Sequence, residues 1–204
     1  MIEAKVRRQL GQFSLSAELE GSGFICLAGK NGSGKTSLLR AIAGLLKIDE
    51  GYVRIDGADI TRSPTEKRGV VMVTPNSFFP HLDVDSHITW GAKLKGTRPE
   101  EERVSNVKTV LGIESGGPVR NLSLGMRERV ALATALLASP KVILVDEAFS
   151  NLHERLGFIA AYRKLIGGQG IDLVFSTHDE AEGALSDHLY VMSNGTTNRQ
   201  QNMS

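Results

Sequence analysis

The sequence predicts an α/β fold in which a mostly parallel sheet forms the core and a helical subdomain is inserted into it. Three observations predict this fold: short apolar runs, helical patterns between these runs, and one internal region of different composition. The short runs lie at residues 24–28, 53–55, 70–73, 142–145, 173–176 and 189–192. Several of them are apolar on consecutive residues, which suits strands covered on both faces, as in a parallel sheet.

Two helices stand out between these runs. In residues 35–46 and 127–138 the apolar side chains recur at helical spacing, so that each segment has one apolar side. Gly44 and Pro140 are expected to help end these helices.

Residues 75–122 differ from the rest, because they hold four of the six prolines, a charged stretch at 99–103 and a glycine-rich turn at 115–118. We therefore predict one domain, with a core of about residues 1–74 and 138–204 and a helical subdomain of about 75–137. The polar tail 194–204 is expected to be frayed.

Composition limits the classes of function. Basic and acidic residues nearly balance, at 24 and 23, so no overall charge favours nucleic acid or an anionic membrane surface. The one cysteine, Cys26, lies in an apolar run, which predicts a buried thiol, excludes a disulfide within the chain and indicates a reducing, cytosolic compartment. The sequence contains no signal peptide and no run of eighteen apolar residues, so a membrane span would have to come from another chain.

The strongest motif is residues 29–36, which fit G-x-x-x-x-G-K-[ST] after a predicted strand and before a predicted helix. Its glycines let backbone N–H groups point at phosphate oxygens, and the helix adds its positive end. Lys35 is expected to reach the β- and γ-phosphates, and Thr36 to ligate Mg²⁺. The alternative is an ordinary glycine-rich turn, which six constrained positions disfavour. The candidate nucleotide-binding residues are Gly29, Lys30, Asn31, Gly32, Ser33, Gly34, Lys35, Thr36 and Ser37.

Two carboxylates follow the buried run 142–145. Asp146 is expected to hold Mg²⁺, and Glu147 to orient the attacking water as a catalytic residue. By itself, an Asp-Glu pair after a strand can also be the solvated start of a loop. Its position downstream of a phosphate cradle favours the catalytic interpretation. His178, just past another apolar run, is expected to contact the γ-phosphate; the alternative is a structural histidine.

Taken in order, the motifs resemble those of the nucleotide-binding subunit of an ABC transporter over almost the whole chain. They lie at 29–36, 79–82, 121–126, 142–147, 150–152 and 176–179. The resemblance implies an ABC-type P-loop ATPase that uses Mg²⁺ with ATP as substrate. It also implies a homodimer or heterodimer in which Ser123 and Gly125, in the signature segment, face the opposite subunit's ATP.

The resemblance further implies membrane partners. Residues 70–84 resemble the loop that contacts the membrane-spanning subunits of importers; the alternative places Phe78, Phe79 and Trp90 in the subdomain core. The protein is then expected in the cytoplasm, at the inner face of the cell membrane, through transmembrane permease subunits. The opening, residues 6–15, is similar to that of molybdate or tungstate importer subunits. A C-terminal regulatory domain, which many importer subunits carry, is not expected after residues 189–192.

Several positions depart from the family pattern. In the signature, Leu124 replaces a glycine and Met126 replaces a glutamine. Thr74 stands where the family has a glutamine, and His153 stands where it has an aspartate. Thr134 occupies a position that is usually arginine, whereas Arg129 agrees with the family pattern. Ser123 can still cap the helix that follows, but a leucine side chain obstructs a close backbone approach. We therefore predict that ATP binding survives and that hydrolysis is slow, since losing one positioned transition-state contact costs about 2–4 kcal/mol.

The sequence thus favours the energy-coupling ATPase of a transporter, with importer as the expected direction. One alternative is a catalytically weak nucleotide-binding module paired with an active homologue, which the signature and Thr74 changes favour. Another is a soluble ABC-type ATPase, but its usual coiled-coil insertions, metal-binding cysteines or second cassette do not occur in this sequence. Phe13 or Leu10 is the candidate to pack on the base.

Overall fold

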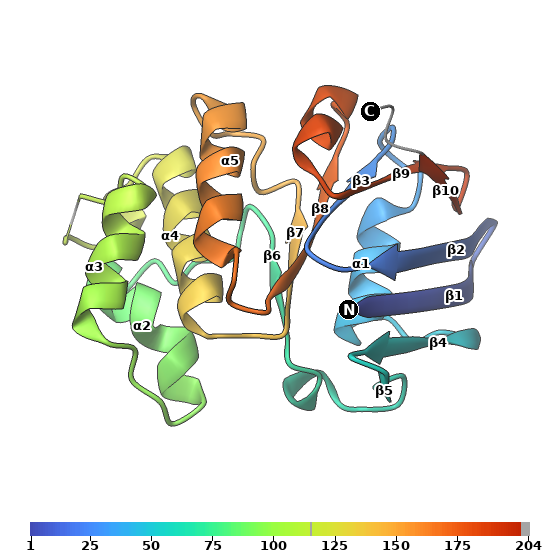
Figure 1. The fold of residues 1–204 in the computed structure, drawn as a ribbon, viewed down its shortest axis with the longest axis horizontal. Helices are drawn as coiled ribbons and strands as arrows, with labels where there is room; N and C mark the ends of the chain where they lie inside the picture. Colours follow the sequence, from blue (N-terminus) through green and yellow to red (C-terminus); the bar gives the residue numbers. More distant parts are fainter. Residues whose placement is uncertain (115, 201–204) are drawn as a thin grey trace. The chain divides into compact units, whose positions relative to one another are not determined.

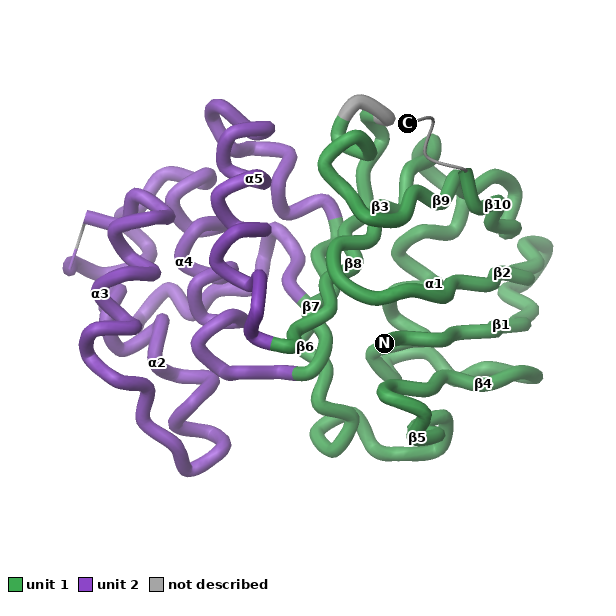
Figure 2. The backbone as a smooth tube through the Cα atoms, viewed as in Figure 1, with its two compact units in different colours: residues 1–72, 141–146, 170–204 green, residues 73–140, 147–169 purple. Residues whose placement is uncertain are grey.

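The computed structural model describes residues 1–114 and 116–200, and the chain divides into two compact units (Figure 2). Unit 1 comprises residues 1–72, 141–146 and 170 onward, and unit 2 comprises residues 73–140 and 147–169. The helical subdomain predicted at about 75–137 lies within unit 2, which also takes in residues 147–169.

Within the described residues the sheet has ten strands in the order β5-β4-β1-β2-β10-β9-β3-β8-β7-β6 (Figure 1). Its parallel part is formed by β3 (Phe24–Ala28), β7 (Val142–Asp146), β8 (Asp172–Thr177) and β9 (His188–Ser193), with β6 (Val70–Val73) at the edge. Every residue of β3, β7 and β8 is buried. The predicted parallel core is therefore confirmed, and so is the burial of Cys26 in β3.

Antiparallel strands continue this sheet, and the sequence predicted only a part of one of them. They are β1 (Ile2–Leu10), β2 (Phe13–Gly21), β4 (Glu50–Ile55) and β5 (Ala58–Asp59). Along β2 buried and exposed residues alternate, as expected for a strand with one face on the core and one in solvent. Such strands lack the continuous apolar runs on which the prediction relied.

The prediction of a frayed tail was wrong for residues 196–200. They form β10 (Thr196–Gln200), which pairs antiparallel with β9 and lies beside β2. The Thr197 hydroxyl donates to the Glu18 carbonyl at 2.6 Å and accepts from the Glu18 N–H at 2.7 Å. The polar segment 196–200 is thus held in a strand by hydrogen bonds to residues that are distant in the sequence or lie on the neighbouring strand. Residues 201–204 of the tail, and position 115 of the predicted glycine-rich turn, lie outside the described residues.

Helix α1 (Lys35–Ala43) packs against β1, β2 and β7, and apolar side chains from all of them form one core. It ends three residues earlier than predicted, because Gly44 adopts a left-handed conformation with φ 81°. The buried guanidinium of Arg68 then donates to the last carbonyls of the helix, those of Ala41 (3.3 Å) and Ile42 (3.0 Å), and to those of Thr61 (2.8 Å) and Ser63 (3.0 Å). Burial lowers the pKa of this guanidinium.

Unit 2 is helical. It contains α2 (Val84–Leu94), α3 (Glu101–Val110), α4 (Leu124–Leu137) and α5 (Arg155–Ile166). Helix α4 begins three residues before the predicted start, and α5, which the sequence analysis did not single out, is joined to it by a hydrogen bond of 3.0 Å from the Tyr162 hydroxyl to the Leu132 carbonyl. The described chain also has short 3₁₀ turns at Thr65–Lys67, Val119–Asn121 and Glu180–Leu185. None of its helices combines the length and the apolar character that a membrane span requires.

Candidate functional site

The phosphate cradle begins where β3 ends. The N–H of Gly29 donates to the carbonyl of Thr177 at 3.0 Å, so the start of the turn is fixed to the end of β8. The turn then runs to Gly34, the residue before the first turn of α1. The motif therefore has the strand–turn–helix context that its chemistry requires, with the N-terminus of α1 opening from the cradle.

Glycine is needed in this turn for two physical reasons. Gly32 and Gly34 have φ values of 78° and 110°, a region that residues with a side chain rarely adopt. A Cβ atom on Gly34 would also lie 2.9 Å from Cζ of Phe13 and 2.9 Å from Cε of Met192, closer than ordinary contacts allow. The ring of Phe13, at the start of β2, therefore lies directly against the cradle backbone.

Two polar side chains are buried in the cradle. The ammonium of Lys35, which is 4% exposed, donates to the carbonyls of Gly29 at 2.8 Å and Lys30 at 3.2 Å. The Ser33 hydroxyl is buried, with 7% of the residue exposed, and has no hydrogen-bond partner among residues 1–114 and 116–200. A buried polar group without a partner costs free energy, so Ser33 fits a ligand that brings an acceptor, as a phosphate does.

Asp146 reaches the same edge of the sheet through strand pairing. Asp146 pairs with Ser176 across β7 and β8, while Ala28 pairs with Thr177 across β3 and β8, so the carboxyl ends of the three strands are neighbours. Asp146 is buried, and its Oδ1 accepts a hydrogen bond of 2.7 Å from the Ser176 hydroxyl. This bond fixes the orientation of the carboxylate at the end of β7.

The oxygen atoms that Asp146 and Thr36 supply are of the type that Mg²⁺ binds. Asp146 supplies carboxylate oxygens and Thr36, exposed in the first turn of α1, supplies a hydroxyl. Within the described ranges there is no group of three or more His, Cys, Asp or Glu side chains able to hold a metal ion. Mg²⁺ needs no such group, since it is commonly held by one or two protein oxygens together with substrate phosphates and water.

Glu147 has an unusual backbone. Its φ is 57°, in the left-handed region, which costs a residue other than glycine about 1 kcal/mol or more. Its carbonyl accepts from the N–H of Ser150 at 3.1 Å and from the Ser150 hydroxyl at 2.6 Å, so the following turn holds the conformation. Strained residues of this kind cluster at functional sites. His178, the other predicted catalytic residue, is exposed and follows directly after β8.

Comparison with known proteins decides the family. A family model described as ABC transporter matches residues 13–150. The chain belongs to the ABC transporter family.

A relative supports this membership. The "Fe(3+) ions import ATP-binding protein FbpC" of Streptomyces coelicolor is 38% identical over 181 residues, which cover 84% of this chain and 51% of the relative. The chain therefore spans about half the length of this curated relative.

Solved structures show the same fold. A dimeric post-hydrolysis structure of the ATP-binding cassette MJ0796 bound to ADP and Pi has a TM-score of 0.83 at 22% identity, with complete coverage of both chains. A second structure, described as the ATP binding subunit of an ABC transporter, has a TM-score of 0.82 at 19% identity, covering 99% of this chain and 90% of the other. The predicted ABC ATPase fold is confirmed.

In this ABC transporter chain the segment predicted as the signature, residues 121–126, runs from the end of the 3₁₀ turn at Val119–Asn121 into the first turn of α4. Ser123 caps the helix as predicted: its hydroxyl accepts from the N–H of Met126 at 3.3 Å. Leu124, which replaces a glycine, is 45% exposed. A Cβ atom on Gly125 would lie 2.9 Å from the carbonyl oxygen of Asn151, so Gly125 lets the helix approach the loop that follows Glu147.

Thr74, which stands where a glutamine is expected, is engaged within its own loop. Its N–H donates to the Ser77 hydroxyl at 2.9 Å, and the two hydroxyl oxygens lie 3.1 Å apart. The side chain of Thr74 is thus directed at a neighbour three residues away.

Sequence reasoning missed a buried acid on α4. Glu128 is 1% exposed, and its Oε1 accepts a hydrogen bond of 2.6 Å from the Asn151 side chain. Burial raises the pKa of this carboxyl, and the Asn151 bond opposes the shift in part. Its burial was not predictable from the sequence, because Glu128 does not lie on the apolar side predicted for this helix, which is formed by Val130, Ala133, Leu136 and Leu137.

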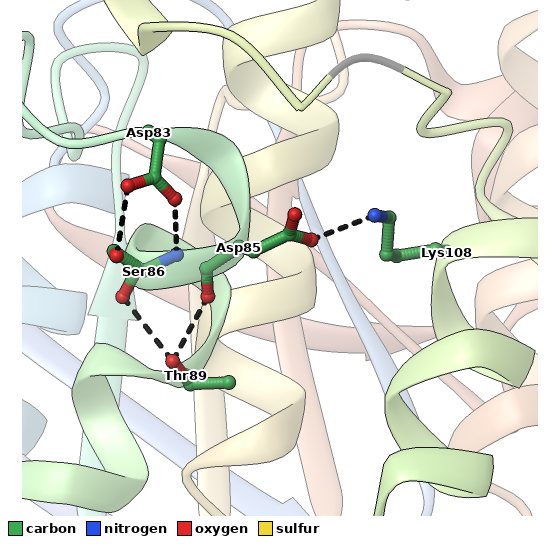
Figure 3. Close-up of polar contacts among 5 residues, drawn as sticks. All are labelled: Asp83, Asp85, Ser86, Thr89 and Lys108. Atoms are coloured by element: carbon green, nitrogen blue, oxygen red, sulfur yellow. Dashed lines mark hydrogen bonds and ion pairs between the residues drawn. The ribbon is translucent and has the colours of Figure 1, made fainter.

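A polar network orders the start of α2 (Figure 3). The carboxylate of Asp83 accepts from the N–H of Ser86 at 2.7 Å and from its hydroxyl at 2.9 Å, which caps the helix. Asp85 pairs with Lys108 of α3 at 2.7 Å, and the Thr89 hydroxyl donates to the carbonyl of Asp85 at 2.9 Å. A cavity of about 1010 Å³ between α2 and α3 is lined by charged groups of both signs, so its charge favours no particular ligand.

Proposed function

We propose that this chain binds Mg-ATP and hydrolyses it as the nucleotide-binding subunit of an ABC importer. The main support for the proposal is the unpartnered buried hydroxyl of Ser33 in the turn that joins β3 to α1, together with the buried ammonium of Lys35 at the start of α1. Family membership and the strand–turn–helix geometry support it further.

Each residue has a defined role in this proposal. The backbone of residues 29–37 and the side chains of Ser33 and Lys35 bind the phosphates, and Phe13 packs on the base. Thr36 and Asp146 would hold Mg²⁺, which when bound neutralises charge on the phosphates. Glu147 accepts a proton from the attacking water and orients it, and His178 donates a hydrogen bond to the γ-phosphate.

The remaining machinery comes from a second ABC domain, identical or different. We propose that Ser123 and Gly125 of one subunit face the ATP held by the other, where the capped N-terminus of α4 presents its N–H groups to the γ-phosphate. The exposed Leu124 and the locally engaged Thr74 support slow hydrolysis. They also support the second candidate, a catalytically weak module whose partner domain supplies the intact signature.

Transmembrane permease subunits are the proposed membrane partners, contacted through the loop of residues 70–84 that includes 79–82. They would hold the protein at the cytoplasmic face of the cell membrane. The relative named as an iron import protein supports the import direction. The similarity of residues 6–15 to molybdate or tungstate importer subunits makes an oxyanion the proposed solute, with the ferric ion of that relative as the competing one.

The test compares Glu147→Gln with Lys35→Ala. Glu147→Gln should bind ATP with near wild-type affinity, stop multiple turnovers and accumulate an ATP-dependent dimer in sedimentation velocity, because only the water-orienting carboxylate is lost. Lys35→Ala should lose affinity in equilibrium dialysis with Mg-ATP, because it removes a cation from the phosphates. Equal turnover by Glu147→Gln and wild type would reject Glu147, and unchanged affinity of Lys35→Ala would reject the cradle.

A further inference from the structure

A buried histidine contacts the aromatic segment of residues 78–81. His87, on α2, is 1% exposed. Its Nε2 accepts a hydrogen bond of 3.0 Å from the backbone N–H of Phe79, and its Nδ1 lies 2.8 Å from the hydroxyl oxygen of Thr134 on α4. One imidazole therefore joins the segment to two helices of unit 2.

The hydrogen-bond network assigns the tautomer of this ring. Because the N–H of Phe79 is a donor, Nε2 must present a lone pair, and the proton of the neutral imidazole is on Nδ1. Nδ1 then donates to Thr134, whose own hydroxyl donates to the carbonyl of Val130 at 2.8 Å. Each donor in this series of hydrogen bonds has an acceptor only while the imidazole ring is neutral.

A protonated ring would break the network at one end. Both nitrogens of an imidazolium are donors, so Nε2 could no longer accept from Phe79. Burial lowers the pKa of His87, and a backbone hydrogen bond opposes the shift in part. The other charged or titratable groups on the elements around the ring are His81 in the segment, Asp83 and Asp85 at the start of α2, Lys93 in its last turn, and Arg127, Glu128 and Arg129 on α4.

The segment fixed in this way presents an aromatic surface. Phe79 is 41% exposed, and its ring centroid lies 5.5 Å from that of His87 and 5.6 Å from that of Trp90. The guanidinium of Arg127 lies 5.0 Å from the centroid of Phe78. Phe78 and Trp90 are half-buried, so the segment is neither a closed core nor a free loop.

We infer that His87, in its neutral form, is the positioning residue that holds Phe79 and the segment 78–81 in the conformation offered to a membrane partner. The part that concerns the partner rests on the proposed function. The positioning itself is a property of unit 2, since every contact that carries it lies within residues 78–134.

The first experiment measures the tautomer and the amide of Phe79 in the intact chain by NMR. The ring nitrogen shifts at pH 7 should show the proton on Nδ1. In His87→Phe, which keeps an aromatic ring without an acceptor, hydrogen exchange of the Phe79 amide should rise about fivefold or more, as expected for the loss of one hydrogen bond. The control is His81→Phe, which changes an exposed histidine of the same segment and should leave that rate unchanged.

The second experiment uses Trp90, the one tryptophan of the chain. Its fluorescence should change as the pH falls below 6.5, the ordinary histidine value, while far-ultraviolet circular dichroism stays constant. The change should persist in His81→Phe and disappear in His87→Phe. If His87→Phe does not fold, Thr134→Val serves instead: it removes the acceptor of Nδ1 and should raise exchange at Phe79.

A ring protonated on Nε2, an unchanged Phe79 exchange rate in His87→Phe, or a wild-type fluorescence that does not respond to pH would each overturn the inference. These measurements need neither nucleotide nor a partner. Their failure would therefore leave the proposed ATPase standing, and failure of the Lys35→Ala test would leave the role of His87 standing.

Discussion

Replacing Ser33 by alanine should have opposite effects on ATP affinity and on folding stability. The Ser33 hydroxyl is buried without a partner among the described residues. Its loss should therefore leave the free energy of unfolding of the nucleotide-free chain unchanged or raise it by up to about 1 kcal/mol. A hydrogen bond to a charged phosphate contributes about 1.5–3 kcal/mol, so Ser33→Ala should weaken ATP binding by roughly 10- to 150-fold.

Two assays separate these effects. Isothermal titration calorimetry with Mg-ATP gives the dissociation constant, and urea unfolding without nucleotide gives the stability. Ser22→Ala is the matched control, because Ser22 is an exposed serine in the turn before β3, outside the cradle. Unchanged ATP affinity in Ser33→Ala, or a stability loss above about 1 kcal/mol, would show that the hydroxyl serves the folded chain rather than a ligand.

Two further predictions concern buried charged groups. Arg68→Ala should lower the free energy of unfolding by about 3 kcal/mol, because four carbonyls lose a charged donor; a thermal melt should show no comparable loss for the exposed Arg62→Ala. Glu128→Gln keeps the acceptor for Asn151 but does not titrate. Because the folded-state pKa of Glu128 is raised, its contribution to stability is full below its ordinary value of 4.5 and is lost as the pH rises through the folded-state value. The stability advantage of Glu128→Gln, measured by urea unfolding, should therefore grow from pH 4 to pH 8, and a constant difference would contradict the assignment.

The cradle was predictable because its determinants are contiguous. A strand, a glycine turn and a helix in sequence order are enough to orient the backbone N–H groups, and the structure has this geometry at residues 24–43. The parallel strands β7 and β8 were likewise visible, since burial on both faces requires continuous apolar runs.

The features that were missed depend on partners distant in the sequence. The polar residues of β10 carry no apolar pattern, and their order comes from pairing with β9 and from the bonds of Thr197 to Glu18. Glu128 and His87 are likewise ordinary helix residues in the sequence. Whether their side chains are solvated or buried is decided by Asn151 and Thr134, which come from other elements of unit 2.

The anchoring of α1 by Arg68 restricts how the cradle can respond to a nucleotide. The helix has nine residues and is therefore about 13 Å long. Its first turn faces the proposed phosphates. Its last carbonyls accept hydrogen bonds from the Arg68 guanidinium, which also donates to the carbonyls of Thr61 and Ser63. Sliding of α1 along its axis would stretch those bonds, so we expect a nucleotide to move the turn at 29–34 rather than the helix itself.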